Sequence, residues 1–140
     1  MRETDNDTAR FARPVRVHGA ADARAALAAA MDLGVPVALV ADAAAGGLWL
    51  RTVLEDARAA VPEAVACAVL DCGDRAGDAQ AALAAGVDAV LFTGPPAVAA
   101  RLADIAAQKG AALLTELPEP LDPRGARDAQ AACRAWLAGG

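Results

Sequence analysis

Serine and tyrosine are absent from the 140-residue chain, lysine and histidine occur once each, and only four residues are aromatic. The absence of serine excludes a serine nucleophile. The net charge is −5, and the sequence contains no run of basic residues. A nucleic-acid-binding surface needs basic residues that neutralise phosphates, usually with aromatic residues between them, so this composition argues against a nucleic-acid partner.

The chain also lacks features of secreted and membrane proteins. No charge-free apolar stretch approaches the roughly 18 residues that a membrane-spanning helix needs, and the amino terminus is polar and charged. The three cysteines are an odd number without a C-x-x-C pair, which fits reduced thiols better than a disulfide framework or a zinc finger. We therefore predict a cytoplasmic protein that has no membrane partner.

Alanine is abundant, with 42 of 140 positions, and short apolar runs alternate with longer helical patterns. Residues 1–12 mix both charges around one apolar side chain and are predicted to be a flexible tail, whereas 13–140 form a single α/β domain. The pattern fits five βα units. The predicted strands are 15–18, 36–41, 66–71, 88–93 and 112–115, and the predicted helices are 21–33, 48–60, 76–85, 97–109 and 127–138.

The composition of the strands indicates their order in the sheet. Strands 36–41, 66–71 and 88–93 are continuous apolar runs, as expected for parallel strands that are covered on both faces. Arg16 interrupts the first strand and the fifth is short, so both are typical of edge strands. This favours the sequential order of half a TIM barrel; the alternative is a flavodoxin-like three-layer sandwich with the first strand at its centre. A half barrel leaves one sheet face bare, which predicts a homodimer or higher oligomer.

Polar residues gather where the predicted strands end, which is the edge where ligands bind in parallel sheets. Asp71 and Asp74, after the third strand, are candidate catalytic acids and bases. His18, Asp42 and Cys72 are candidate ligands of a divalent metal. Taken singly, each of these residues is explained as a helix cap or turn residue, but two acids and a thiol within 71–74 exceed what one cap requires.

Two glycine-containing turns are candidate ligand-binding loops. Thr93 and Gly94 precede two prolines at the start of a helix, where free N–H groups can meet an anion. Gly46 and Gly47 form a second, weaker candidate. Neither turn has a nucleotide-binding spacing, and both are also consistent with simple strand-to-helix turns.

The segment 35–115 resembles class II fructose-bisphosphate aldolases. VPVALVADAAAGG is similar to their second strand and glycine-bearing loop, VACAVLDCGD to their third strand ending in L-D-H-G, and AAGVDAVLFTG to the strand that follows. The resemblance implies a half barrel in which Asp71 takes the place of the catalytic acid. Cys72 stands where the family has a zinc-binding histidine.

A second resemblance is to response-regulator receiver domains. Asp71 and Thr93 end consecutive strands, and TELPEPLDP is similar to the T-K-P-F-D-P of receivers. The sequence has Glu116 at the position of the receiver lysine, and His18 with Gly19 at that of the acidic pair.

The sequence favours a non-catalytic module that binds a small ligand or another protein. The alternative is an aldolase-like, metal-dependent lyase that uses a carboxylate such as Asp71.

Overall fold

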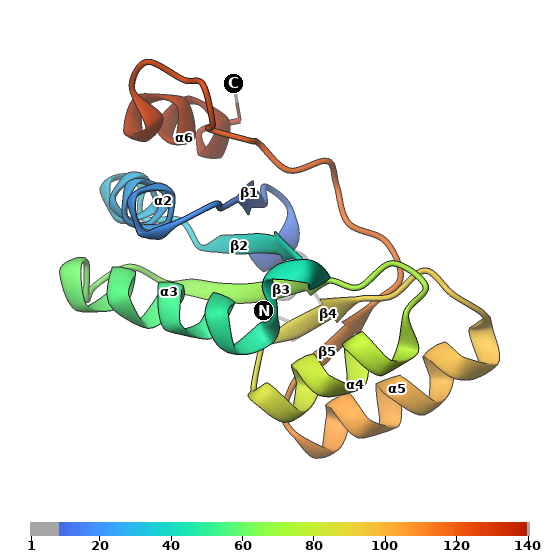
Figure 1. Ribbon diagram of the computed structural model, residues 1–140. Coiled ribbons are helices and arrows are strands. Elements are labelled where there is room, and N and C mark those ends of the chain that lie inside the picture. Colours follow the sequence, from blue (N-terminus) through green and yellow to red (C-terminus); the bar gives the residue numbers. More distant parts are fainter. Residues whose placement is uncertain (1–8, 140) are drawn as a thin grey trace. The chain divides into compact units, whose positions relative to one another are not determined.

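The computed structural model describes residues 9–139 and has an α/β fold with one parallel five-stranded sheet (Figure 1). Its strands follow one another in the order β1-β2-β3-β4-β5. They are β1 (Val15–Arg16), β2 (Val37–Asp42), β3 (Ala66–Asp71), β4 (Ala89–Leu91) and β5 (Ala112–Leu114). The predicted sequential order is confirmed, and the flavodoxin-like alternative is wrong.

The helices begin and end within two residues of their predicted bounds. They are α2 (Ala20–Leu33), α3 (Gly47–Ala60), α4 (Ala76–Ala85), α5 (Pro96–Gln108) and α6 (Ala129–Leu137), with a short 3-10 turn at Ala43–Ala45. Helices α2 and α4 end at Gly34 and Gly86, whose φ angles of 67° and 90° suit only glycine without strain. No helix in 9–139 is long and apolar enough to cross a membrane.

The predicted tail falls mostly on residues 1–8, which lie outside the described residues. Its described part, residues 9–11, is helical, and Phe11 is 7% exposed. The guanidinium of Arg10 lies 4.9 Å from the centre of the Phe11 ring. Of these three residues, Phe11 is buried, whereas Ala9 is exposed.

The chain divides into two compact units. The first comprises the described residues 9–40, 53–67 and 118–139, and the second comprises 41–52 and 68–117. In the first unit, α2 and α6 pack side by side (Figure 1). Leu121 pairs with the outer edge of β1, because it accepts the N–H of Arg16 at 2.7 Å and donates its own N–H to Pro14 at 3.0 Å. The edge of β1 is thus covered by the chain itself.

In the second unit, α4 packs beside α5, and α5 packs on β5 (Figure 1). Strands β3, β4 and β5 are aligned so that Asp71 pairs with Leu91, and Leu91 pairs with Leu114. The carboxyl ends of these strands consequently lie level with one another.

Burial along the strands corrects the expectation of a bare sheet face. Residues 37–41 of β2 and 67–70 of β3 are each at most 6% exposed. Because neighbouring strand residues point to opposite faces, both faces of these two strands are covered. All three residues of β5, in contrast, are half-buried. In the described sheet, apolar exposure is thus found at the β5 edge rather than along β2 and β3.

Candidate functional site

A groove lies between α5 and β5, at the carboxyl ends of β4 and β5, and has a volume of about 590 Å³. None of its lining residues is charged: Phe92, Thr93, Gly94, Pro96, Ala99, Ala100, Ala103, Leu113 and Thr115. Two of the predicted ligand residues, Thr93 and Gly94, thus line the same cavity. We call this cavity the α5–β5 groove.

Two hydroxyl groups supply the side-chain polarity of the groove. Thr93 and Thr115 follow neighbouring strands, which are held in register by the Phe92 N–H donated to the carbonyl of Leu114 at 2.9 Å. Both threonines are exposed. Neither hydroxyl has a hydrogen-bond partner within 9–139, so both are available to a ligand.

The backbone around Thr93 is fixed by local contacts. Its N–H donates to the carbonyl of Gly73 at 2.7 Å, which ties the turn after β4 to the turn after β3. A Cβ at Gly94 would overlap the ring of Phe92, which is 1% exposed. Glycine at this position therefore lets the Phe92 ring close the floor of the groove.

Gly46 and Gly47 do not line this groove; their roles here are in a turn and in packing. Gly46 has a φ of 88° and closes the 3-10 turn by donating its N–H to Ala43 at 3.0 Å. A Cβ at Gly47 would lie 3.1 Å from the Cα of Ala82 and 3.2 Å from a methyl of Val87. Gly47 is buried, so close packing of α3 against α4 explains it without a ligand.

The two acids and the thiol within residues 71–74 do not lie together: Asp71 and Asp74 belong to the turn after β3, and Cys72 belongs to the core. One carboxylate oxygen of Asp71 accepts the N–H of Gly73 at 3.1 Å, which is the turn role that the sequence left open. Asp74 is exposed. The N–H of Cys72 donates to Leu91 at 2.9 Å, so pairing with β4 continues one residue beyond Asp71.

The prediction that Cys72 is an exposed metal ligand is wrong, because its thiol is buried. Because side chains alternate along a strand, Cys72 points away from the side that Asp71 takes, and it is 0% exposed. Burial, followed by the negative charges of Asp78 and Asp71, raises the pKa of Cys72 to about 11. The neutral thiol is therefore favoured over the thiolate that binds metals.

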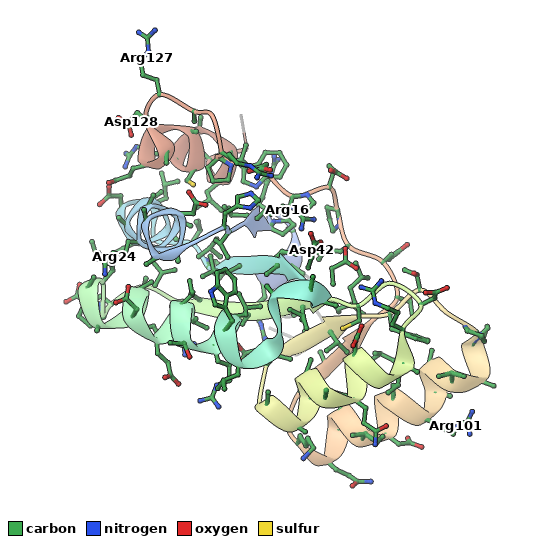
Figure 2. All side chains as sticks on the ribbon, viewed as in Figure 1. Arg16, Arg24, Asp42, Arg101, Arg127 and Asp128 are labelled. Atoms are coloured by element: carbon green, nitrogen blue, oxygen red, sulfur yellow. The ribbon has the colours of Figure 1, made fainter. Side chains whose placement is uncertain are left out.

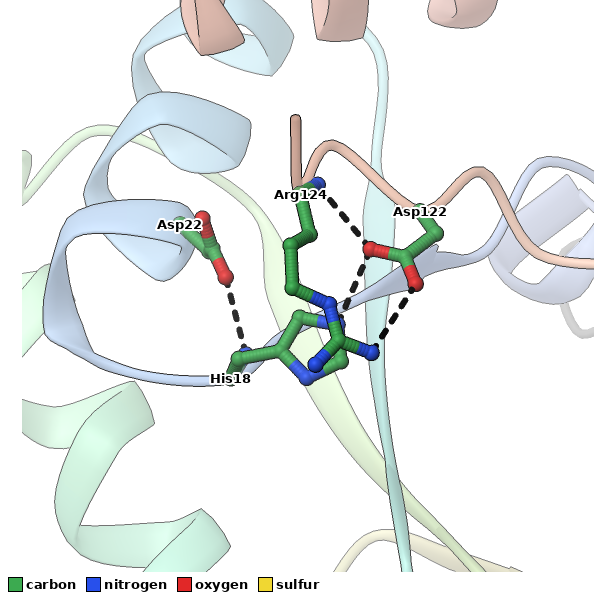
Figure 3. A network of polar contacts seen from close by, with 4 residues as sticks. All are labelled: His18, Asp22, Asp122 and Arg124. Carbon is green, nitrogen blue, oxygen red and sulfur yellow. Dashed lines mark hydrogen bonds and ion pairs between the residues drawn. The ribbon is translucent and has the colours of Figure 1, made fainter. Parts of the chain in front are cut away.

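His18 belongs to a polar network in the first unit (Figure 3). Its Nε2 lies 2.9 Å from a carboxylate oxygen of Asp122, and its backbone N–H donates to Asp22 in the first turn of α2. The same oxygen of Asp122 accepts the N–H of Arg124 at 3.0 Å. The Arg124 N–H, and then His18, lower the pKa of Asp122. This network joins the loop after β1 to the segment that covers the β1 edge.

The predicted metal ligands do not assemble into a site within the described chain. Asp42 is exposed at the end of β2, His18 contacts Asp122, and Cys72 is buried. In residues 9–139, no group of three or more His, Cys, Asp or Glu side chains is placed to hold a metal ion.

A second cavity, of about 460 Å³, lies in the first unit, next to the residues that precede β2 and β3. It is lined by Ala9, Arg10, Ala30, Met31, Gly34, Val35, Pro36, Glu63 and Val65. This cavity is at the amino ends of the strands, opposite to where ligands bind in parallel sheets. It is the alternative position for a small ligand in this chain.

No protein-family model matches the chain, and no curated protein matches it.

Proposed function

We propose that this protein binds a small neutral molecule in the α5–β5 groove and performs no chemistry on it. One observation supports this most directly. A single groove combines apolar walls with two hydroxyl groups, on Thr93 and Thr115, that have no hydrogen-bond partner within the described residues. Binding sites for small molecules are mostly apolar clefts of about 300–1,000 Å³ with a few polar groups that fix orientation. The groove, at about 590 Å³, falls within that range.

The lining residues define the class of ligand. Because the groove has no charged side chain, a charged ligand would lose hydration without gaining an ion pair. A threonine hydroxyl both donates and accepts hydrogen bonds, so it suits a hydroxyl, carbonyl or amide group. The ligand that fits is a neutral molecule with an apolar body and one such group near Thr93 and Thr115.

A lyase that uses Asp71 and a metal is a weaker proposal. Asp71 is occupied by the turn at Gly73, and the thiol of Cys72 is protonated and buried. The resemblances to aldolases and receiver domains therefore remain predictions.

Saturation-transfer NMR with benzyl alcohol, cyclohexanol and benzamide tests the proposed function. The wild type is compared with Thr93→Val and Thr115→Val, which remove the hydroxyls and keep the shape. Loss of one hydrogen bond costs about 0.5–1.5 kcal/mol, so each variant should bind about two- to tenfold more weakly.

Thr52→Val is the matched control. Thr52 is exposed on α3, and its hydroxyl donates to the carbonyl of Leu48 at 2.8 Å, away from the groove residues. Equal binding by the wild type and the Thr93→Val/Thr115→Val double variant, or no binding of any probe, would refute the proposed site.

A further inference from the structure

Exposed apolar side chains gather at the cavity of the first unit. Within 9–139, the large apolar residues that are exposed are Met31 at 40%, Leu48 at 69% and Val65 at 66%. Two of them, Met31 and Val65, line this one cavity, which has a volume of about 460 Å³. Exposed apolar surface that lines a hollow is typical of a binding site. The cavity shares no lining residue with the α5–β5 groove.

Backbone hydrogen bonds hold the apolar walls of this cavity in place. The N–H of Val35 donates to the carbonyl of Ala30 at 3.1 Å, which fixes the turn after α2. The N–H of Val37 donates to the carbonyl of Val65 at 3.0 Å, which fixes the residues before β2 against those before β3. These backbone groups are already paired within the chain. Selectivity for a ligand must therefore come from the side chains of the lining.

Two side chains of opposite charge supply that polarity. Arg10 is half-buried and Glu63 is exposed, and both line the cavity. The guanidinium of Arg10 lies over the ring of Phe11, 4.9 Å from its centre, and Phe11 is buried. Contact with a ring uses the face of a guanidinium and leaves N–H donors at its edge, where a carboxylate binds. The same contact restricts the arginine side chain before a ligand arrives.

We propose that this cavity binds a free α-amino acid with an apolar side chain. The carboxylate of the ligand pairs with Arg10, and its ammonium group pairs with Glu63. Its apolar side chain covers Met31 and Val65. A ligand with a single charge would be attracted to one of the two lining charges and repelled by the other, whereas a zwitterion matches both. This inference does not depend on the neutral ligand of the α5–β5 groove.

Amide chemical-shift titrations with three related probes test the proposal. L-Phenylalanine carries both charges, 3-phenylpropionate lacks the ammonium group, and 2-phenylethylamine lacks the carboxylate. We expect L-phenylalanine to shift the amides of Met31, Gly34 and Val65, and to bind about three- to tenfold more tightly than either single-charge probe. No shift at these residues, or an affinity for L-phenylalanine no higher than for a single-charge probe, would overturn the proposal.

Substitutions of the two charged residues assign each charge. Glu63→Gln should weaken L-phenylalanine about three- to tenfold and leave 3-phenylpropionate no weaker, because the repulsion of its carboxylate is removed. Arg10→Gln should weaken both of these probes and leave 2-phenylethylamine no weaker. If Glu63→Gln leaves the affinity for L-phenylalanine unchanged, or weakens all three probes equally, the zwitterion assignment is refuted.

Two exposed residues outside the lining provide matched controls. Arg127→Gln is the control for Arg10→Gln, because Arg127 extends away from the chain before α6 (Figure 2). Glu119→Gln is the control for Glu63→Gln. Both control variants should bind L-phenylalanine like the wild type. Benzyl alcohol, which tests the α5–β5 groove, carries neither charge, so the two proposals fail separately.

Discussion

The reactivity of Cys72 gives a quantitative test of how β3 ends. The thiolate reacts with thiol reagents and the thiol does not, so the rate follows the fraction ionised. An ordinary cysteine here has a pKa of 9.0, and burial raises the pKa of Cys72 to about 11. Cys133, buried against α2, has its pKa raised to about 11 by the same cause.

A shift of about two pKa units lowers the thiolate fraction near neutral pH about 100-fold. The reagent must also reach side chains that are 0% exposed for Cys72 and Cys133, which requires local opening of the structure. Both effects slow the reaction. We therefore expect no rapidly reacting thiol in the native protein and three after denaturation, since Cys67 is also buried.

The assay is a time course with a chromogenic disulfide at pH 8, followed by mass spectrometry to locate the label. One equivalent of rapid labelling at Cys72 in the native state would refute the placement of this thiol in the core.

The same pKa shifts predict an alkaline limit of stability. Native pKa values above the unfolded value of 9.0 mean that the unfolded chain loses its protons first. The stabilisation is complete below pH 9 and is lost between pH 9 and about 11, by roughly 3 kcal/mol per thiol. Urea unfolding of wild type and Cys72→Ala across this range should show a smaller pH dependence in the variant, and equal pH dependence would contradict the shift.

Substitutions at four further positions test local features. Gly47→Ala should lower the free energy of unfolding by about 1–3 kcal/mol through overpacking against α4, whereas Gly77→Ala, where a Cβ meets open space within a helix, should raise it by about 0.5–1 kcal/mol. Asp71→Ala should cost about 0.5–1.5 kcal/mol by removing the acceptor of the following turn, and Asp71→Asn should cost less; equal losses on urea unfolding would argue against a turn role. Asp122→Asn should reduce the loss of stability that occurs as the pH falls into the acid range. Because the native pKa of Asp122 is lowered, its stabilisation is present above the unfolded value of 3.8 and is lost as the pH falls through the native value, as melting temperatures will show.

The order of the elements was predictable because local chemistry and tertiary packing agree. Continuous apolar runs identified β2, β3 and β4. In α3, Leu50, Val53, Leu54 and Ala57 recur at helical spacing and are buried. Arg16 and the short β5 correctly indicated the two edges of the sheet. The prediction of a bare sheet face was wrong. Whether both faces of a strand are buried depends on which distant segments cover them, and an apolar run in the sequence does not show which segments these are.

The candidate site was predictable only in part. Thr93 and Gly94 were identified because strand ends meet at one edge of a parallel sheet. The orientation of Cys72 was missed because it depends on one further hydrogen bond to Leu91, beyond the apparent end of β3. The contact of His18 with Asp122 joins residues 104 positions apart, which no local pattern reveals.

Amide chemical-shift mapping with benzyl alcohol tests the proposed ligand site most directly. The account predicts that shifts concentrate in the α5–β5 groove, at Thr93, Gly94, Ala100 and Thr115. Shifts concentrated instead around Met31 and Val65, in the cavity of the first unit, or an absence of shifts in the groove at saturating probe, would contradict it.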